Sequence, residues 1–442
     1  MGKPRRDFLR AITSAASLSA LMPIVQSVRE TELTEKSGAT SQDFRTHFPL
    51  LKEAASGQPF VYLDSAATTQ RPGAVLDALA NFYLHANANP ARSLHGLARR
   101  SAALYDEARA SVARFVNARG TDEIVFTRGT TEAINLVASS WGGANLRSGD
   151  EILITVADHY SNLVPWQLAA RRAGANLRVL DVSDDGRLRL DQLDELVSKR
   201  TKIVTFPHVS NVLGAINSAK EICERAHRSG AVVLVDAAQS VPHFPVDVQE
   251  LGCDFLAFSG HKMCGPMGIG VLWARRELLD AMPPFQAGSN MTHELEIESV
   301  PHFAEGGLKF EAGTPNVPGA IGLAAAIAFL DSFHRQTLWA QEQELTRYVL
   351  RSLQKIAGLK ILGPTVPSER VSVFSFVIEN RQPLEVVKAL DARNVAVRGG
   401  DLASLPLLKR MGLTAAVRAS CYSYTTTADV DQLIAGLSDK RS

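Results

Sequence analysis

A lysine follows a short apolar run near the middle of the chain. Residues 255–258, Phe-Leu-Ala-Phe, read as a buried strand, and Ser259-Gly260-His261-Lys262 comes directly after it. An amine at the end of a buried strand is partly desolvated, so its pKa falls and it can form a Schiff base with a carbonyl compound. The alternative is an ordinary surface lysine in a loop. Lys262 is the first candidate for chemistry, and the rest of the chain decides between the two readings.

Polar side chains follow the other apolar runs in the same way. Each run reads as a strand, and a helical pattern separates it from the next. Such alternation predicts an α/β fold with a mostly parallel sheet, in which ligands bind at the carboxyl ends of the strands. Singly, each polar residue has an ordinary explanation as a helix cap, a turn residue or a satisfied histidine. Together they predict one site, formed by Thr130, Thr131, His159, Asn211, Asp236, Gln239, Ser259, His261 and Lys262.

Pyridoxal phosphate is a ligand that would use all of these groups. Its aldehyde would be held by Lys262, and a buried Asp236 would pair with the protonated pyridine nitrogen. His159 would stack on the ring and move protons, which makes it the second candidate catalytic residue. The remaining contacts would be hydrogen bonds to the ring oxygen from Asn211 and Gln239, and to the phosphate, at a helix N-terminus, from Thr130, Thr131, Ser259 and His261.

Two arginines near the C-terminus are candidates for substrate binding. Arg418 lies in the apolar run Ala416 to Ser420 and could hold a substrate carboxylate through two hydrogen bonds. Arg398 is the second candidate. The alternative for Arg418 is a surface arginine at the end of a strand. If the arginines belong to the site, the substrate is a small molecule of the amino-acid type.

The elements group into two predicted domains. A large cofactor-binding domain is expected over residues 58–318, and a smaller α+β domain over residues 319–442 begins with an alanine-rich helix from Gly319 to Phe333. Residues 28–57 read as a linker with some helix, interrupted at Pro49.

Composition excludes several classes of function. The 442 residues carry a net charge of +1, so nothing in the total points to a nucleic-acid partner. The four cysteines, Cys223, Cys253, Cys264 and Cys421, show no metal-binding spacing, and no metal site is expected.

The first residues resemble a twin-arginine export signal. Arg5 and Arg6 precede Phe8-Leu9, and a weakly apolar run follows over residues 11–22. That run is too short to span a membrane as a helix. We therefore expect residues 1–27 to be a signal peptide read by the twin-arginine machinery, and the mature protein to be periplasmic or exported. The alternative is a disordered basic tail.

From Phe60 to the C-terminus the chain resembles the class V aminotransferase family, and within it the cysteine desulfurase and selenocysteine lyase group. The resemblance implies the fold of type I pyridoxal-phosphate enzymes and a homodimer with active sites at its interface. It also implies that Thr314 reaches the phosphate bound by the partner subunit. The matching stretches are residues 62–67, 127–132, 208–214, 235–239, 259–262 and 310–316.

The chain departs from this group in two loops. The group carries a nucleophilic cysteine in a stretch reading Arg-x-Gly-His-His-Cys-Ala-x-Pro, and residues 398–406 correspond to it. Ala403 stands at the position of the cysteine, and Asp401 and Leu402 stand at the histidines. In the second loop a substrate-side histidine becomes Ala91, although the neighbouring Arg92 is kept as a candidate for substrate binding.

Alanine cannot attack sulfur, so three kinds of function stay open. The first is a C–S lyase, which eliminates a sulfur group from a cysteine-type amino acid. The second is an exported transaminase, epimerase or oxidative decarboxylase acting on an amino-acid or peptide-siderophore amine. The third is a protein that binds the cofactor without catalysis. Cys264 and Cys421 either approach the site or are small buried core residues, and the second alternative is favoured.

Overall fold

The computed structural model describes residues 41–52, 60–90, 94–293 and 296–438. The predicted signal peptide, part of the predicted linker, Ala91 and Arg92 lie outside the described residues. The predictions made for them stay predictions.

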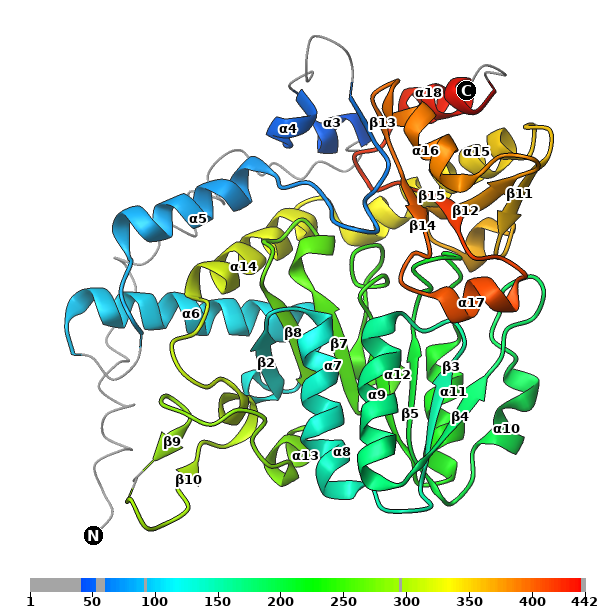
Figure 1. The fold of residues 1–442 in the computed structure, drawn as a ribbon. Coiled ribbons are helices and arrows are strands. Elements are labelled where there is room, and N and C mark those ends of the chain that lie inside the picture. Colours follow the sequence, from blue (N-terminus) through cyan, green and yellow to red (C-terminus); the bar gives the residue numbers. More distant parts are fainter. Residues whose placement is uncertain (1–40, 53–59, 91–93, 294–295, 439–442) are drawn as a thin grey trace.

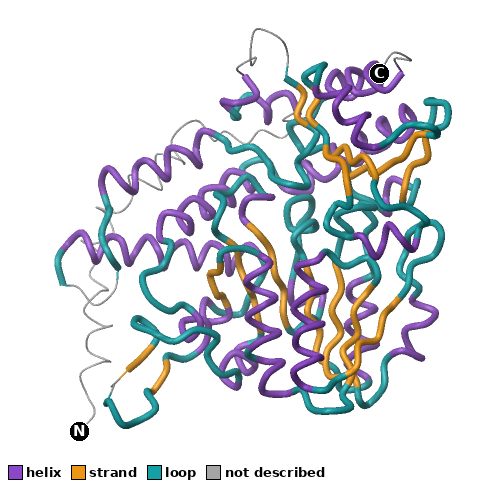
Figure 2. The backbone as a smooth tube through the Cα atoms, viewed as in Figure 1, coloured by secondary structure: helices purple, strands orange, loops and turns teal. Residues whose placement is uncertain are grey.

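A seven-stranded sheet forms the centre of the larger part of the molecule (Figures 1 and 2). Six strands are parallel, and β8 runs antiparallel to both of its neighbours. The sequence thus correctly predicts a mostly parallel sheet, although it does not indicate the reversed strand. In spatial order the strands are β2 (Ile124–Thr127), β8 (Gly270–Ala274), β7 (Phe255–Ser259), β6 (Val232–Asp236), β5 (Thr201–Pro207), β3 (Glu151–Thr155) and β4 (Asn176–Leu180).

Except at the edge strand β4, both faces of this sheet are buried, which explains its continuous apolar strands. Alternate residues of β7 point to opposite faces: Phe255 and Ala257 belong to one hydrophobic cluster, and Leu256 and Phe258 to another. The covering helices are α6 (Gly96–Phe115), α7 (Thr130–Ser139), α8 (Trp141–Asn145), α9 (Tyr160–Ala173), α11 (Ala219–Arg228), α12 (Val248–Leu251), α13 (Arg276–Ala281) and α14 (Val317–Asp331). The short helix α10 (Leu193–Leu196) lies beside β4.

A smaller antiparallel sheet lies above the carboxyl edge of the large one (Figure 1). Its order is β11 (Leu359–Leu362), β12 (Val373–Ile378), β15 (Ala416–Ser420) and β14 (Arg398–Gly400), and its helices are α15 (Arg335–Leu353), α16 (Pro383–Asp391), α17 (Leu405–Arg410) and α18 (Thr427–Ser438). The N-terminal strand β1 (Val61–Tyr62) pairs with β13 (Val395–Ala396), so the start of the predicted large domain is joined to the C-terminal unit.

The remaining elements lie at the margin. The helices α3 (Ser41–Arg45) and α4 (Pro49–Lys52) are anchored by Phe44 and Phe48, whose rings pack against Phe329. The helix α5 (Gly73–His85) packs on α14, and the hairpin β9 (Thr292–His293) and β10 (His302–Phe303), which the sequence does not reveal, lies below them in Figure 1.

No single helix in the described ranges has the length and apolar character needed to cross a membrane. One bent pair, α14 with α15, meets that criterion only when its two helices are counted together.

A buried ion pair fixes the segment that carries Thr314. Arg109 donates two hydrogen bonds to the carboxylate of Glu311, at 2.8 and 2.6 Å, and the Tyr105 hydroxyl donates a third at 2.9 Å. The backbone N–H of Phe126 also donates to Glu311, at 2.7 Å, so the segment is tied to β2. Because all of these groups are buried, losing the guanidinium leaves an unpaired charge in the interior.

We therefore predict that Arg109→Met lowers the free energy of unfolding by about 3–5 kcal/mol. Arg114, on the same helix, is the matched control: its pair with Glu107 is exposed, at 66% and 57%, and Arg114→Met should cost less than about 1 kcal/mol. Urea unfolding followed by tryptophan fluorescence measures both. Equal losses in the two variants would contradict the structural role of the Arg109–Glu311 pair.

Candidate active site

A cavity of about 460 Å³ lies at the carboxyl edge of the large sheet, and residues of the loop 398–403 form part of its wall. The structure brings most of the predicted site residues to its wall: Thr130, Thr131, His159, Asn211, Asp236, Gln239, Ser259, His261, Lys262, Arg398 and Arg418. Thr314 does not line this cavity. Its hydroxyl accepts a hydrogen bond from Asn89 at 3.2 Å.

Lys262 lies one short turn beyond β7, in the 3-10 helix Gly260–Lys262. Desolvation lowers the pKa of its amine to about 8, although Asp236 opposes the shift. About one tenth of the amine is therefore neutral at pH 7, far more than for an ordinary lysine, and the neutral amine is the form that reacts with a carbonyl carbon.

Asp236 ends β6 and is 6% exposed. Burial raises the pKa of its carboxyl group, while Lys262 and the N–H of Ala238, which donates to Oδ1 at 2.9 Å, act in the opposite direction. A cation placed next to Asp236 is stabilised electrostatically, because water solvates this buried carboxylate poorly. A protonated pyridine nitrogen is such a cation.

His159 caps the N-terminus of α9. Its Nδ1 accepts a hydrogen bond from the N–H of Ser161 at 3.1 Å, which leaves the ring proton on Nε2. Desolvation, followed by the charges of Lys262 and Arg418, lowers the pKa of the imidazole to about 4. The ring is neutral at physiological pH and can lie against an aromatic ligand without adding charge.

The N-terminus of α7 forms a cradle of hydroxyl and backbone N–H groups. The N–H of Thr130 donates to Ser259 Oγ at 2.8 Å, the hydroxyls of Thr130 and Ser259 are 2.7 Å apart, and the Thr131 hydroxyl lies 2.7 Å from Ser161 Oγ. Gly129 precedes them at a positive φ of 156°. A Cβ added to Gly270 would lie only 2.5 Å from the Cα of Gly129, so the two backbones approach closely here. This close approach of backbone, hydroxyls and helix N-terminus suits a phosphate.

The two amide side chains predicted to contact a ring oxygen are held in place by backbone carbonyls. Gln239 Nε2 donates to the Ala66 carbonyl at 2.7 Å, and Asn211 Nδ2 donates to the Leu402 carbonyl at 2.9 Å. Each NH2 group keeps a second hydrogen, so the predicted contacts stay available.

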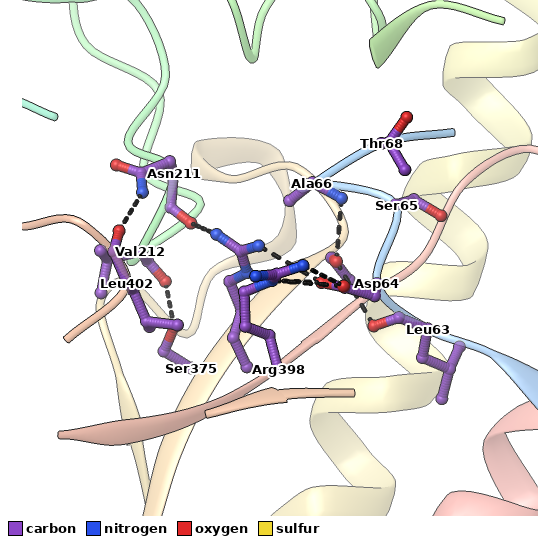
Figure 3. Close-up of polar contacts among 12 residues, drawn as sticks. Leu63, Asp64, Ser65, Ala66, Thr68, Asn211, Val212, Ser375, Arg398 and Leu402 are labelled. Carbon is purple, nitrogen blue, oxygen red and sulfur yellow. Dashed lines mark hydrogen bonds and ion pairs between the residues drawn. The ribbon is translucent and has the colours of Figure 1, made fainter. Parts of the chain in front are cut away.

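The two arginines converge on a residue that the sequence does not single out. Asp64 accepts hydrogen bonds from Arg398 at 2.8, 3.1 and 3.2 Å (Figure 3). It also accepts one from Arg418 at 3.4 Å. Arg418 is 3% exposed and also donates to the Asn211 carbonyl, at 3.0 Å, but its Nε has no partner. Two guanidinium groups thus share one carboxylate, and the remaining positive charge faces the cavity.

The loop with Ala403 is closed onto α9. The Tyr160 hydroxyl donates to Asp401 at 2.8 Å, and the Tyr160 N–H donates to the Ala403 carbonyl at 2.9 Å. Leu402 and Ala403 both have positive φ, 52° and 54°, a conformation that needs such support. Ala403 consequently lines the cavity.

The cysteines lie elsewhere. All four are buried and none lines the cavity, so Cys264 and Cys421 are core residues, as the favoured alternative states. Burial raises the pKa of the Cys264 thiol to about 12 and raises that of Cys421. Neither is a thiolate at neutral pH.

The wall of the cavity fits pyridoxal phosphate group by group. Lys262 offers an amine for the aldehyde, Asp236 a buried carboxylate for the ring nitrogen, and the cradle at Thr130 a site for the phosphate. His159 supplies a neutral ring.

Comparisons with known proteins give the family. The model of the family "Aminotransferase class-V" matches residues 61–433. A probable cysteine desulfurase of Halalkalibacterium halodurans is 46% identical over 397 residues, which are 90% of this chain and 97% of that protein.

Solved structures agree with this result. A cysteine desulfurase from Escherichia coli superposes with a TM-score of 0.83 at 38% identity, covering 90% of this chain and 98% of its own. A cystine C–S lyase has the same fold, with a TM-score of 0.75 at 23% identity, covering 86% of this chain and 97% of its own. The chain belongs to the class V aminotransferase family, as an enzyme of its cysteine desulfurase-like group, whose cofactor is pyridoxal phosphate.

Proposed function

We propose that the enzyme is a C–S lyase acting on an S-substituted cysteine. The reaction is a β-elimination: R–S–CH2–CH(NH3⁺)–COO⁻ and water give R–SH, pyruvate and ammonium. The Cα–H and Cβ–S bonds break, the sulfur leaves with the electron pair of the Cβ–S bond, and the released three-carbon product hydrolyses to pyruvate and ammonium. The reaction needs a base but no nucleophilic thiol.

The observation that carries the proposal is the position of Ala403 on the cavity wall. The resemblance places a sulfur-accepting cysteine there in desulfurases, and among the described residues that line the cavity none is a cysteine. The residues that would hold the cofactor are retained in this cavity: Lys262, Asp236 and the hydroxyl groups near Thr130 line it. Because the cofactor-binding residues are kept and the sulfur-accepting cysteine is absent from the cavity wall, elimination is favoured over desulfuration.

Each side chain has a defined task in this reaction. Arg418, with Arg398, binds the substrate carboxylate through the charge that Asp64 leaves unbalanced. Bound pyridoxal phosphate supplies an electron sink that weakens the bonds at Cα. Lys262, with a pKa of about 8, then takes the Cα proton. His159, a neutral ring with its proton on Nε2, donates a hydrogen bond to the departing sulfur, which leaves as a thiolate.

The enzyme works as a homodimer in this proposal. Large apolar side chains are exposed on α5 and at the start of α6, among them Leu84 at 72% and Tyr83 at 60%. A second copy covering this surface also gives Thr314, which lies outside its own cavity, a place at the partner's phosphate. Sedimentation velocity tests this: a monomer at micromolar concentration would contradict it.

The same proposal places the mature enzyme outside the cytoplasm. Arg5 and Arg6 with the apolar run at residues 11–22 support twin-arginine export, which accepts proteins already folded around a cofactor. Fractionation of cells carrying Arg5→Lys with Arg6→Lys is the check, since the doubly substituted chain should stay in the cytoplasm.

The reaction itself is tested by its products. We predict that the purified mature protein releases pyruvate and ammonium in equal amounts, with a thiol or persulfide, from L-cystine or an S-substituted cysteine. L-Alanine, which has no leaving group at Cβ, is the control. Alanine with sulfide, formed from L-cysteine, would mean desulfuration and would contradict the lyase. Keto acid or epimer formation from amines without sulfur would favour the exported transaminase, epimerase or decarboxylase instead.

A further inference from the structure

One charged group on the cavity wall has no part in the reaction as proposed. The side chains of Lys262, Asp236, His261, Arg398 and Arg418 each have a task toward cofactor or substrate. Asp401 also lines the cavity, and its carboxylate is exposed. In the part of the chain that the structure describes, no lysine, arginine or histidine forms an ion pair with it.

Hydrogen bonds orient this carboxylate without neutralising it. Oδ1 accepts from the N–H of Ala403 at 3.1 Å, and Oδ2 accepts from the Tyr160 hydroxyl at 2.8 Å. Both donors are uncharged. They lower the pKa of the Asp401 carboxyl, so the group is an anion at physiological pH. A fixed negative charge therefore stands at the wall, with room in the cavity beside it.

Groups of the opposite sign also line the cavity. Arg398 and Arg418 share the carboxylate of Asp64, which leaves one positive charge in excess. His159 lies within reach of both fields: Arg418 lowers the pKa of its imidazole, and Asp401 raises it. The substrate space is thus bounded by a positive and a negative group, with His159 near both.

We propose that Asp401 selects substrates whose sulfur-bound group carries a positive charge, such as an ammonium group. That the distal group is bound to sulfur rests on the proposed lyase function. The preference for a positive charge rests on the charges that line the cavity. The α-carboxylate lies at the arginines, the reacting carbon near Lys262, and the distal cation at Asp401. An anionic distal group is repelled.

Binding of three matched amino acids tests this without any C–S chemistry. L-Lysine, L-norleucine and L-2-aminoadipate have unbranched side chains of similar length that end in a cation, a methyl group and an anion. We expect the holoenzyme to bind L-lysine about fivefold more tightly than L-norleucine, as one partly exposed ion pair provides, and L-2-aminoadipate most weakly. Isothermal titration calorimetry measures the three dissociation constants. Equal affinities, or tightest binding of L-norleucine, would overturn the inference.

Two variants separate charge from loop structure. In Asp401→Asn the side-chain oxygen still accepts from Ala403, and the amide can donate to Tyr160, so the loop keeps its contacts. The ratio of the L-norleucine to the L-lysine dissociation constant should fall to about one. Tyr160→Phe removes a contact of the loop but not the charge, so the ratio should persist. A ratio that Asp401→Asn leaves at its original value would refute the role of Asp401.

The salt dependence of the preference for L-lysine tests the role of charge without any variant. In 1 M sodium chloride the preference of the holoenzyme for L-lysine over L-norleucine should fall to about half or less, because this ion pair is open to solvent. A preference that salt does not reduce would mean that the charge is not its cause.

The inference and the proposed function fail in different ways. If L-lysine is preferred but no S-substituted cysteine yields pyruvate, charge selection stands and the lyase is wrong. If pyruvate forms from both S-(2-aminoethyl)-L-cysteine and S-propyl-L-cysteine with equal kcat/KM, the lyase stands and the role of Asp401 is wrong.

Discussion

Replacing Lys262 by alanine should abolish turnover and remove the visible absorbance of the cofactor bound covalently to the enzyme. Lys262 provides both the attachment and the proposed base, and loss of a general base alone costs about 10²–10⁴-fold in rate. We expect kcat to fall by at least about 10³-fold. Activity is followed by pyruvate release, and the absorbance by the spectrum of the purified variant.

The matched control is Lys202, a lysine that lies 3.6 Å from Asp150 and is 40% exposed. Lys202→Ala should keep the spectrum and the activity. A purified Lys262→Ala protein that retains both would show that the cofactor assignment is wrong.

The pKa of Lys262 adds a pH dependence to the same prediction. Only the neutral amine attacks an aldehyde, and desolvation lowers the pKa of this amine to about 8. The rate at which cofactor-free enzyme captures pyridoxal phosphate should therefore rise with pH and reach half its maximum near pH 8. A half-maximum near pH 10.5, the ordinary value for lysine, would contradict a desolvated position.

Much of the fold could be predicted because its strands are buried on both faces. Such strands appear as uninterrupted apolar runs, and residues 255–258 are a strand in the structure as the sequence predicts. Once these runs are parallel, the residues after them must meet at one edge of the sheet. This is why Asp236, Ser259 and Lys262 come to one cavity, although up to 26 positions separate them in the sequence.

Contacts between distant parts of the chain could not be predicted in this way. Asp64 joins Arg398 and Arg418 because β1 pairs with β13 and because Asp64 itself is bridged to Ser420, pairings that no local pattern encodes. The antiparallel direction of β8 is also set by its neighbours and not by its own apolar residues.

The loop at Ala403 is likewise held by contacts with residues that are distant in the sequence. The sequence indicates which residue replaces the cysteine, but not that Tyr160 and Asn211 hold the loop against the cavity. Asn211 is therefore a residue with two tasks: it was predicted from its position after β5 as a ligand for the cofactor, and it also supports the loop. A local pattern can suggest the first task but not the second.

Replacing Arg418 by alanine should raise the dissociation constant of an α-amino carboxylate by about 30-fold or more. Arg418 is buried and remains cationic at neutral pH, since desolvation lowers the pKa of its guanidinium only to about 10. Removing one partner of a buried, hydrogen-bonded charge pair costs about 2–5 kcal/mol, which corresponds to that factor or more. Calorimetry with L-norleucine measures the effect.

A ligand without a carboxylate separates recognition from structure. Arg418 also donates to the Asn211 carbonyl, so its loss could loosen the site in general. n-Pentylamine equals L-norleucine without the carboxylate, and its dissociation constant should change by less than about threefold in Arg418→Ala. Arg398, whose side chain is 49% exposed, is the comparison. Solvent screens its charge, so Arg398→Ala should raise the dissociation constant of L-norleucine by no more than about fivefold. Equal losses for both ligands in Arg418→Ala would assign Arg418 to the scaffold, and an unchanged dissociation constant for L-norleucine would remove it from the substrate site.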